Sequence, residues 1–109
     1  MTYQHQQLAS GKWQAMSFVE QMANIGSEVE RTIIWKTKNS DYSQKALDRA
    51  LELLDLSIAD NKNRSRLKEL LRVRETLADC FFGDNLFSST DKSWRSYFYP
   101  FNYAARLNH

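Results

Sequence analysis

The chain has 109 residues, of which 42% are hydrophobic and 26% charged, so it has the size and composition of one globular domain. Only 3 Gly and 1 Pro are present, which argues against a β fold with many turns and against disorder. The net charge of +2 is too small for the whole molecule to attract nucleic acid, and a single cysteine excludes an internal disulfide and a thiolate zinc site.

The first residues are polar and end in Ser10-Gly11, so we expect a flexible leader at 1–11 and a single helical-bundle domain at 12–109. The start lacks the basic residues and apolar run of a secretory signal peptide. No apolar stretch approaches the roughly 18 residues that span a bilayer. Together with the unpaired Cys80, these features predict a cytoplasmic protein without a membrane partner.

The segment 12–36 is predicted to form the first helix, because its apolar residues recur every three or four positions. These residues are Phe18, Met22, Ile25, Val29 and Ile33. Gly26 lies beside this stripe, where glycine costs about 1 kcal/mol relative to alanine. We expect the close approach of a neighbouring helix to offset that cost.

A turn at 38–40 precedes a second predicted helix, which runs to about Ala59. Asp41 and Gln44 have the spacing of a capping box, with Ser40 as the alternative cap. The inward face comprises Leu47, Ala50, Leu51, Leu54 and Ile58. Ala46 and Leu53 widen that face, which predicts that this helix packs against two neighbours.

The polar stretch 60–63 is a short loop, so the helices on either side of it should be antiparallel. The third helix is predicted at 64–82, with Gly83 just past its end. Its apolar stripe comprises Leu67, Leu70, Leu71, Leu77, Ala78 and Phe81.

Ser89 or Thr90 is expected to cap a fourth helix, whose inner face comprises Trp94, Tyr97, Phe98, Phe101 and Ala105. Pro100 removes a backbone hydrogen bond and clashes with the preceding turn, at about 3 kcal/mol. We therefore expect a kink or break at 97–99 and a short last helix to about Leu107. The four segments together predict an all-α, up-and-down four-helix bundle with a proline-kinked fourth helix.

Chemistry that needs histidine has little support in this chain. The two histidines, His5 and His109, lie in the terminal tails, so dimetal, Ser-His-Asp and Cys-His sites have no positioned base. We therefore expect no catalytic residue, no metal site and no cofactor.

Acidic residues close together offer a different chemistry, because Mg²⁺ prefers oxygen ligands. The pairs are Glu52 with Asp55, Glu75 with Asp79, and Glu28 with Glu30. All-α nucleotide pyrophosphohydrolases use such pairs on facing helices, so an Mg²⁺-dependent nucleotide hydrolase is one hypothesis. Against it, Glu52 and Asp55 point away from the apolar stripe, as expected of a solvated surface.

A basic run surrounds the predicted start of the third helix. It comprises Lys62, Arg64, Arg66, Lys68, Arg72 and Arg74. Positive charge opposes the dipole at a helix N-terminus, which makes contact with phosphate a hypothesis for this run. A solvated face is the ordinary interpretation of a run of charges and the alternative here. Arg74 also interrupts the apolar stripe, and a buried guanidinium needs a partner. Glu28 and Glu30 are the candidate partners; an anion bound between helices is the alternative.

Aromatic residues make up 13% of the chain and gather at 94–103. One helical face cannot bury them all, and exposed aromatic surface is typical of an interface. The residues expected to take part are Trp94, Tyr99, Tyr103 and Trp35, with Trp13 also outside the main stripe. We expect them to mediate self-association; stacking on nucleic-acid bases, or burial under a terminal tail, would use the same side chains.

Residues 23–31 (ANIGSEVER) and 42–47 (YSQKAL) resemble a family of small uncharacterised prokaryotic helical proteins, over most of 13–105. More distantly, the layout is similar to that of the four-helix proteins encoded in intervening sequences of large ribosomal RNA. Their Asn-Ile-Ala-Glu-Gly element corresponds here to residues 24–28 (NIGSE). Because those proteins form oligomers, the resemblance implies a helical bundle that self-associates, and it assigns no functional residue.

These patterns lead to three hypotheses. The first is a non-enzymatic cytoplasmic interaction protein that forms a homo-oligomer. The second is an accessory protein that binds nucleic acid through the basic run at 62–74. The third is the Mg²⁺-dependent nucleotide hydrolase.

Overall fold

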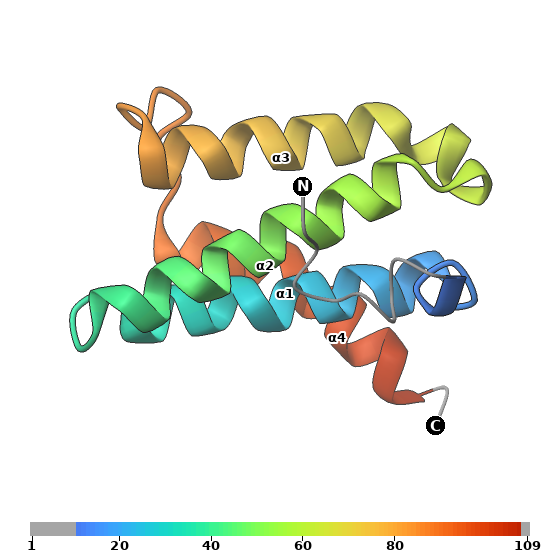
Figure 1. Cartoon of the computed structure of the whole chain (residues 1–109), viewed down its shortest axis with the longest axis horizontal. Helices are drawn as coiled ribbons and strands as arrows, with labels where there is room; N and C mark the ends of the chain where they lie inside the picture. The colour runs from blue at the N-terminus through green and yellow to red at the C-terminus, as the bar shows by residue number, and fades with distance from the viewer. Residues whose placement is uncertain (1–10, 108–109) are drawn as a thin grey trace.

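A computed structural model describes residues 11–107 of the chain, so the predicted flexible leader, apart from Gly11, and both histidines lie outside the described residues. The helices are α1 (Phe18–Trp35), α2 (Ser40–Ile58), α3 (Leu67–Phe82) and α4 (Asp91–Leu107), with a 3₁₀ helix η2 (Asn61–Arg66) before α3. Residues 11–107 contain no strand, and the predicted all-α four-helix bundle is confirmed (Figure 1). No helix in this range combines the length and apolar composition needed to cross a bilayer.

The helices are packed in the order α4, α1, α2, α3. Helix α1 contacts α2 on one side and α4 on the other, and α3 packs against α2 (Figure 1). Both Ala46 and Leu53 are buried, so the prediction that α2 meets two neighbours is confirmed. Helices α3 and α4 are not among the closely packed pairs, and we call the side of the bundle between them the α3–α4 edge.

The close approach predicted at Gly26 is confirmed between α1 and α4. A Cβ atom added to Gly26 would lie 2.9 Å from Cγ and Cδ1 of Phe98, nearer than such contacts normally come. Because Phe98 is itself buried, its ring has little room to move away. The absence of a side chain at residue 26 therefore sets the distance between these two helices.

The first helix begins later than predicted. Ser17 caps α1, its Oγ accepting a hydrogen bond from the Glu20 backbone N–H at 3.1 Å, and Ser17 Oγ also bonds Glu20 Oε1 at 3.3 Å. Ser17 and Glu20 have the Ser-x-x-Glu spacing of a capping box, although Glu20 accepts from the Ser17 hydroxyl and not from its backbone N–H. This spacing marks a helix start that the apolar periodicity alone does not show. Trp13 therefore lies in the turn before α1, where it is fully buried rather than exposed as expected.

The capping box predicted at Asp41 and Gln44 is wrong. Asn39 caps α2 instead, its Oδ1 accepting hydrogen bonds from the backbone N–H groups of Asp41 at 3.1 Å and Tyr42 at 3.2 Å. Gln44 donates to Asp48 one turn later, at 2.9 Å. Asn is as good a cap as Asp or Ser, so propensity alone did not separate the neighbouring candidates.

Residues 60–66 contain a 3₁₀ helix rather than an open loop followed by an α-helix, so α3 begins at Leu67 and not at residue 64. Asp60 and Asn63 are buried in a polar cluster that we call the Trp13 network. Its members are Trp13, Gln21, Ser57, Asp60, Lys62 and Asn63. It joins the turn before α1 to the end of α2 and to η2, and thereby holds the start of the domain in place.

Inside the Trp13 network, Trp13 Nε1 donates to Ser57 Oγ at 3.0 Å, and Gln21 Nε2 donates to Asp60 Oδ2 at 3.0 Å. Asn63 Nδ2 donates to Gln21 Oε1 at 2.8 Å. Burial alone would raise the pKa of Asp60, but the hydrogen bonds from Lys62 and Gln21 outweigh it, so the pKa is lowered.

The apolar stripe predicted for α3 is only partly correct. Leu70 and Leu77 are buried, but Leu67 and Leu71 are 36% and 47% exposed, and Val73 takes the third core position. The reason is that α3 packs mainly against one neighbour, so its buried face is narrower than the stripe in the sequence. Gly83 ends α3 as predicted.

Helix α4 is capped by Thr90, whose Oγ1 accepts from the Ser93 backbone N–H at 3.0 Å while the Thr90 N–H donates to Ser93 Oγ at 2.8 Å. The predicted break at 97–99 is wrong, because α4 continues through Pro100 to Leu107. A kink at this proline stays a prediction.

Candidate functional site

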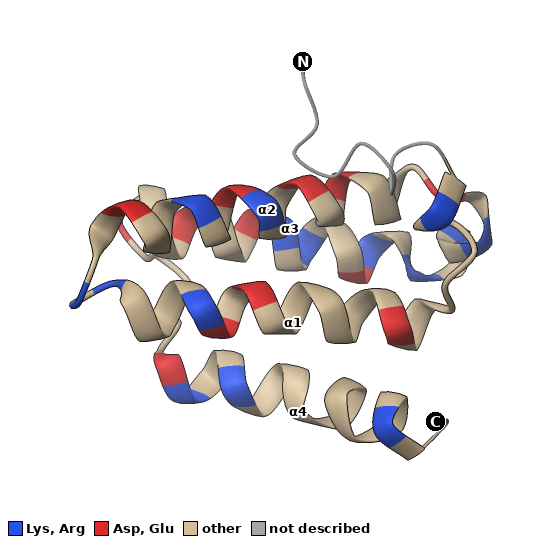
Figure 2. Cartoon of the chain, turned by 60° about the horizontal axis from the view of Figure 1, so that its bottom comes forward, with Lys and Arg blue, Asp and Glu red and all other residues tan. Residues whose placement is uncertain are grey.

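The structure divides the basic run at 62–74 into paired and unpaired side chains. Three of its cations form ion pairs: Lys62 with Asp60, Arg66 with Glu69, and Arg74 with Asp55. The other three are exposed and form no ion pair within residues 11–107: Arg64, Lys68 and Arg72. Figure 2 shows blue segments gathered where α2 leads into α3, with red segments nearby. The basic run is therefore a mixed surface with three free cations, not a uniform positive patch.

The predicted pairing of Arg74 with Glu28 or Glu30 is wrong. Arg74 Nε donates to Asp55 Oδ1 at 2.6 Å and Nη2 donates to Oδ2 at 3.3 Å, at a position where both side chains are over a third exposed. The expected partners bind other cations: Glu28 pairs with Arg31 and Arg49, and Glu30 pairs with Arg95. Because α3 packs mainly on α2, Arg74 reaches the polar face of α2.

The acidic pairs do not converge on a metal site. Asp55 is engaged by Arg74, and the carboxylate of Asp79 accepts hydrogen bonds from the backbone N–H groups of Leu86 at 2.9 Å and Phe87 at 3.1 Å. Within the described part of the chain, no group of three or more His, Cys, Asp or Glu residues is arranged to hold a metal ion. The geometry that the hydrolase hypothesis requires is therefore not formed by these residues.

The aromatic side chains of α4 separate onto two faces. Trp94 is only 5% exposed and belongs to the core, so its predicted place in an exposed interface is wrong. Tyr99 and Tyr103 are 63% and 54% exposed, and their rings stack with centroids 6.3 Å apart. Trp35 is half-buried at the other end of α1, against the ring of Tyr42. Of the four expected interface residues, only Tyr99 and Tyr103 form an exposed pair with each other.

A hollow of about 480 Å³ lies beside this tyrosine pair, between α1 and α4. The residues that line it include Gly26, Phe98 and Tyr99. Arg95 and Glu30 cross it in a two-pronged ion pair, with Nε and Nη2 of Arg95 donating to Glu30 at 2.8 and 2.9 Å. The hydrogen bond to Glu30 raises the pKa of Arg95, which stays charged.

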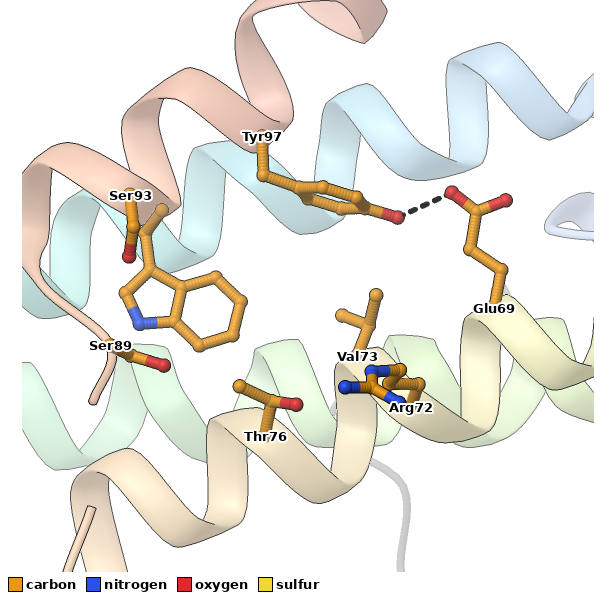
Figure 3. Close-up of a pocket in the computed structure, with 8 residues that line it drawn as sticks. Glu69, Arg72, Val73, Thr76, Ser89, Ser93 and Tyr97 are labelled. Carbon is orange, nitrogen blue, oxygen red and sulfur yellow. Dashed lines mark hydrogen bonds between the residues drawn. The ribbon is translucent and has the colours of Figure 1, made fainter. Parts of the chain in front are cut away.

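A second cavity, of about 260 Å³, lies at the α3–α4 edge. Figure 3 shows Val73 and Thr76 facing it from α3, with Ser93 and Tyr97 on α4 across from them. At one end Tyr97 Oη donates to Glu69 Oε2 at 2.6 Å, bridging the two helices. Burial and this carboxylate raise the pKa of Tyr97, so its hydroxyl remains a hydrogen-bond donor at neutral pH.

Trp94 also lines this cavity, and its buried Nε1–H has no hydrogen-bond partner among the described residues. Sequence reasoning placed Trp94 and Tyr97 on the inner face of α4 but found neither the cavity nor the Tyr97–Glu69 bond. The sequence did offer one signal for this bond. A buried tyrosine or tryptophan normally needs a polar partner, and the basic run contains few acidic residues that could serve as that partner.

Comparison with known proteins does not assign the chain to a family. No protein-family model, no curated protein and no solved structure matches the chain.

Proposed function

We propose that the protein is a non-enzymatic interaction protein that self-associates through the outer face of α4. The observation that carries the proposal is the stacked, exposed pair of Tyr99 and Tyr103 next to the hollow between α1 and α4. Tyrosine is enriched in protein interfaces and in the side chains that dominate their binding energy.

The arrangement suits contact between identical copies. A two-fold dimer needs one surface that is complementary to itself, because each residue meets the same patch on the other subunit. A projecting aromatic pair and a hollow lie side by side on this face, so each copy would place its tyrosines in the hollow of the other. The Arg95–Glu30 pair offers polar groups to the tyrosine hydroxyls.

Self-association is tested by analytical ultracentrifugation of the whole chain and of a Tyr99→Ser/Tyr103→Ser variant. Each interface tyrosine is expected to contribute about 1 kcal/mol, and each counts twice in a two-fold dimer, so the variant should dissociate about a thousandfold more readily. The matched control is Tyr42→Ser, which removes a 52% exposed tyrosine from α2 and should leave the dimer intact.

A monomeric wild-type protein would overturn the proposal. An oligomer that survives in the double variant would show that another surface is used. Circular dichroism should show equal helicity in all three proteins, because the substituted rings lie outside the core.

A second candidate function, contact with nucleic acid, is favoured by the three unpaired cations Arg64, Lys68 and Arg72. Three phosphate contacts give a salt slope of only about −3 on double-stranded DNA, so binding through them alone would be weak. The Arg64→Gln/Lys68→Gln/Arg72→Gln variant should abolish retention of RNA or DNA at about 50 mM salt, where phosphate contacts are strongest. No retention of either by the wild type would remove this candidate.

A further inference from the structure

A third cavity, of about 300 Å³, lies between the end of α1 and the first half of α2. Three basic and two aromatic residues line it: Arg31, Trp35, Tyr42, Lys45 and Arg49. The first two are one helical turn apart on α1, and the other three recur after three and four positions on one face of α2. The turn that follows Trp35 brings these two stripes together.

The positive charge at this cavity is only partly compensated. Both arginines bind one carboxylate, that of Glu28: Arg31 through Nη1, and Arg49 through Nε at 2.9 Å. The Glu28 side chain is only 10% exposed, so it is a fixed partner for both guanidinium groups. Lys45 is exposed and forms no ion pair within residues 11–107. Three cations therefore share one carboxylate, and two positive charges are left without a counter-charge.

The two arginines also keep hydrogen-bond donors for a second anion. A guanidinium has five N–H groups, and the bond to Glu28 engages one nitrogen of each arginine in the described structure. A phosphate monoester carries about 1.5–2 negative charges at neutral pH, and its oxygens match the planar donors of arginine. Such a group fits both the charge and the donors that remain at this cavity.

The aromatic walls favour a ligand that also has a planar ring. Trp35 and Tyr42 meet edge to face, with centroids 5.3 Å apart. Tyr42 is 52% exposed, so part of its ring is uncovered, and a nucleobase stacks readily on such a ring. The volume is at the lower end of the roughly 300–1,000 Å³ typical of small-molecule sites, which favours one nucleotide over a longer ligand.

We propose that the cavity between α1 and α2 binds a nucleoside monophosphate. Its phosphate group binds Arg31, Lys45 and Arg49, and its base stacks on the ring of Tyr42. The site is separate from the tyrosine pair of α4 and does not depend on self-association. Arg31 also lines the hollow beside that pair, so the test replaces Lys45 and Tyr42 instead.

The test uses ¹⁵N-labelled full-length protein and follows the indole N–H signal of Trp35 by NMR, assigned from a Trp35→Phe variant. Adenosine 5′-monophosphate (AMP) is the probe. Ribose 5-phosphate, which lacks the base, and adenosine, which lacks the phosphate, are its matched partial probes. AMP should shift the Trp35 signal with a Kd of about 0.1 mM, and each partial probe should bind at least about tenfold more weakly. The Trp13 signal should stay in place, because its N–H already donates to Ser57.

Variants separate the phosphate from the base. Lys45→Gln should weaken AMP binding about tenfold, because a contact to a charged group is lost. The matched control is Lys68→Gln, which removes another exposed, unpaired cation and should change AMP affinity less than about twofold. Tyr42→Ser should lower the affinity for AMP to that for ribose 5-phosphate. AMP should bind the Tyr99→Ser/Tyr103→Ser variant as it binds the wild type.

A Trp35 signal that stays in place with about 10 mM AMP would overturn the proposal. Inorganic phosphate that binds as tightly as AMP would show an adventitious ion only, and adenosine that binds as tightly as AMP would overturn the assignment of a phosphate. Equal losses in Lys45→Gln and Lys68→Gln would contradict this cavity as the site. A short single-stranded oligonucleotide that binds far more tightly than AMP through Lys45 would assign the cavity to nucleic acid and contradict the proposal.

Discussion

Two tryptophans of this bundle, Trp13 and Trp94, are buried in regions that differ in their hydrogen bonding. Trp13 is fully buried and its indole N–H donates to Ser57 Oγ at 3.0 Å, within the Trp13 network. Trp94 is also buried, yet its N–H has no partner in the described structure, although Trp94 is one of the residues that line the cavity at the α3–α4 edge. Similar burial thus accompanies a satisfied polar group in one region and an unsatisfied one in the other.

The two regions also differ in how many side-chain hydrogen bonds join their elements. The Trp13 network uses its polar side chains to join α2, η2 and the turn before α1. At the α3–α4 edge, a single side-chain hydrogen bond, from Tyr97 to Glu69, joins the two helices within residues 11–107. The α3–α4 edge therefore keeps a cavity of about 260 Å³ and few polar links, whereas the polar side chains of the Trp13 network are joined to one another.

The largest expected difference between the two regions comes from replacing each tryptophan by phenylalanine. Trp13→Phe removes buried contacts and the bond to Ser57, and should destabilise the protein by about 2–3 kcal/mol. Trp94→Phe loses similar contacts but also removes the unsatisfied donor, so it should cost about 1 kcal/mol or less. Urea unfolding followed by circular dichroism measures both values. Equal losses would show that the Trp94 N–H is satisfied in solution.

Much of the fold could be predicted because it depends on spacing along the chain. The stripe from Met22 to Ile33 is buried, and a Cβ added to Gly26 would lie 2.9 Å from the Phe98 ring. The buried stripe follows from helical periodicity. The close approach follows from the glycine, because glycine inside a helix lowers stability unless a neighbouring helix packs against it. The late start of α1 was also open to prediction, because Ser17 and Glu20 have the spacing of a capping box.

The remaining features depend on which helices become neighbours, and periodicity does not contain that information. Leu70 is buried while Leu71 is 47% exposed, because α3 packs mainly on one partner. Arg74 pairs with Asp55 for the same reason. Trp94 was expected outside because the aromatic residues of α4 outnumber the positions on one face, and the sequence does not show which of them remain exposed.

The hydroxyl of Tyr97 provides the next largest contrast. Tyr97→Phe removes a hydrogen bond to a carboxylate at a half-buried position, and should cost about 1.5 kcal/mol. Tyr99→Phe is the matched control, since Tyr99 is 63% exposed on the other face of the same helix, and it should change stability by less than about 0.5 kcal/mol. Thermal unfolding of both variants compares them. A loss no larger for Tyr97 than for Tyr99 would mean that the bond does not hold α3 to α4.

Replacing one cation in each region should change the free energy of unfolding by a smaller amount. Lys62 belongs to the Trp13 network, where it pairs with Asp60 and donates to the Gln14 carbonyl at 3.0 Å, so Lys62→Gln should cost about 1 kcal/mol. Arg72 forms no ion pair within the described residues, so Arg72→Gln should lie within about 0.5 kcal/mol of the wild type. Urea unfolding in parallel tests the pair. A larger loss for Arg72 would contradict its assignment as a free cation at the cavity.

Titration of Asp60 and Tyr97 should have the smallest effect on stability at neutral pH. The Trp13 network should lose stability in acid, and the α3–α4 edge should lose stability in alkali. The pKa of Asp60 is lower in the folded protein, so its contribution is complete above the unfolded value of about 4 and is lost as the pH falls through the folded pKa. The pKa of Tyr97 is raised, so its contribution is complete below about pH 10 and is lost as the pH rises further. Unfolding measured across pH should therefore show a loss in acid that Asp60→Asn removes and a loss in alkali that Tyr97→Phe removes. If Tyr97→Phe left the alkaline loss unchanged, the hydroxyl would not be held by Glu69, and the α3–α4 edge would be joined by packing alone.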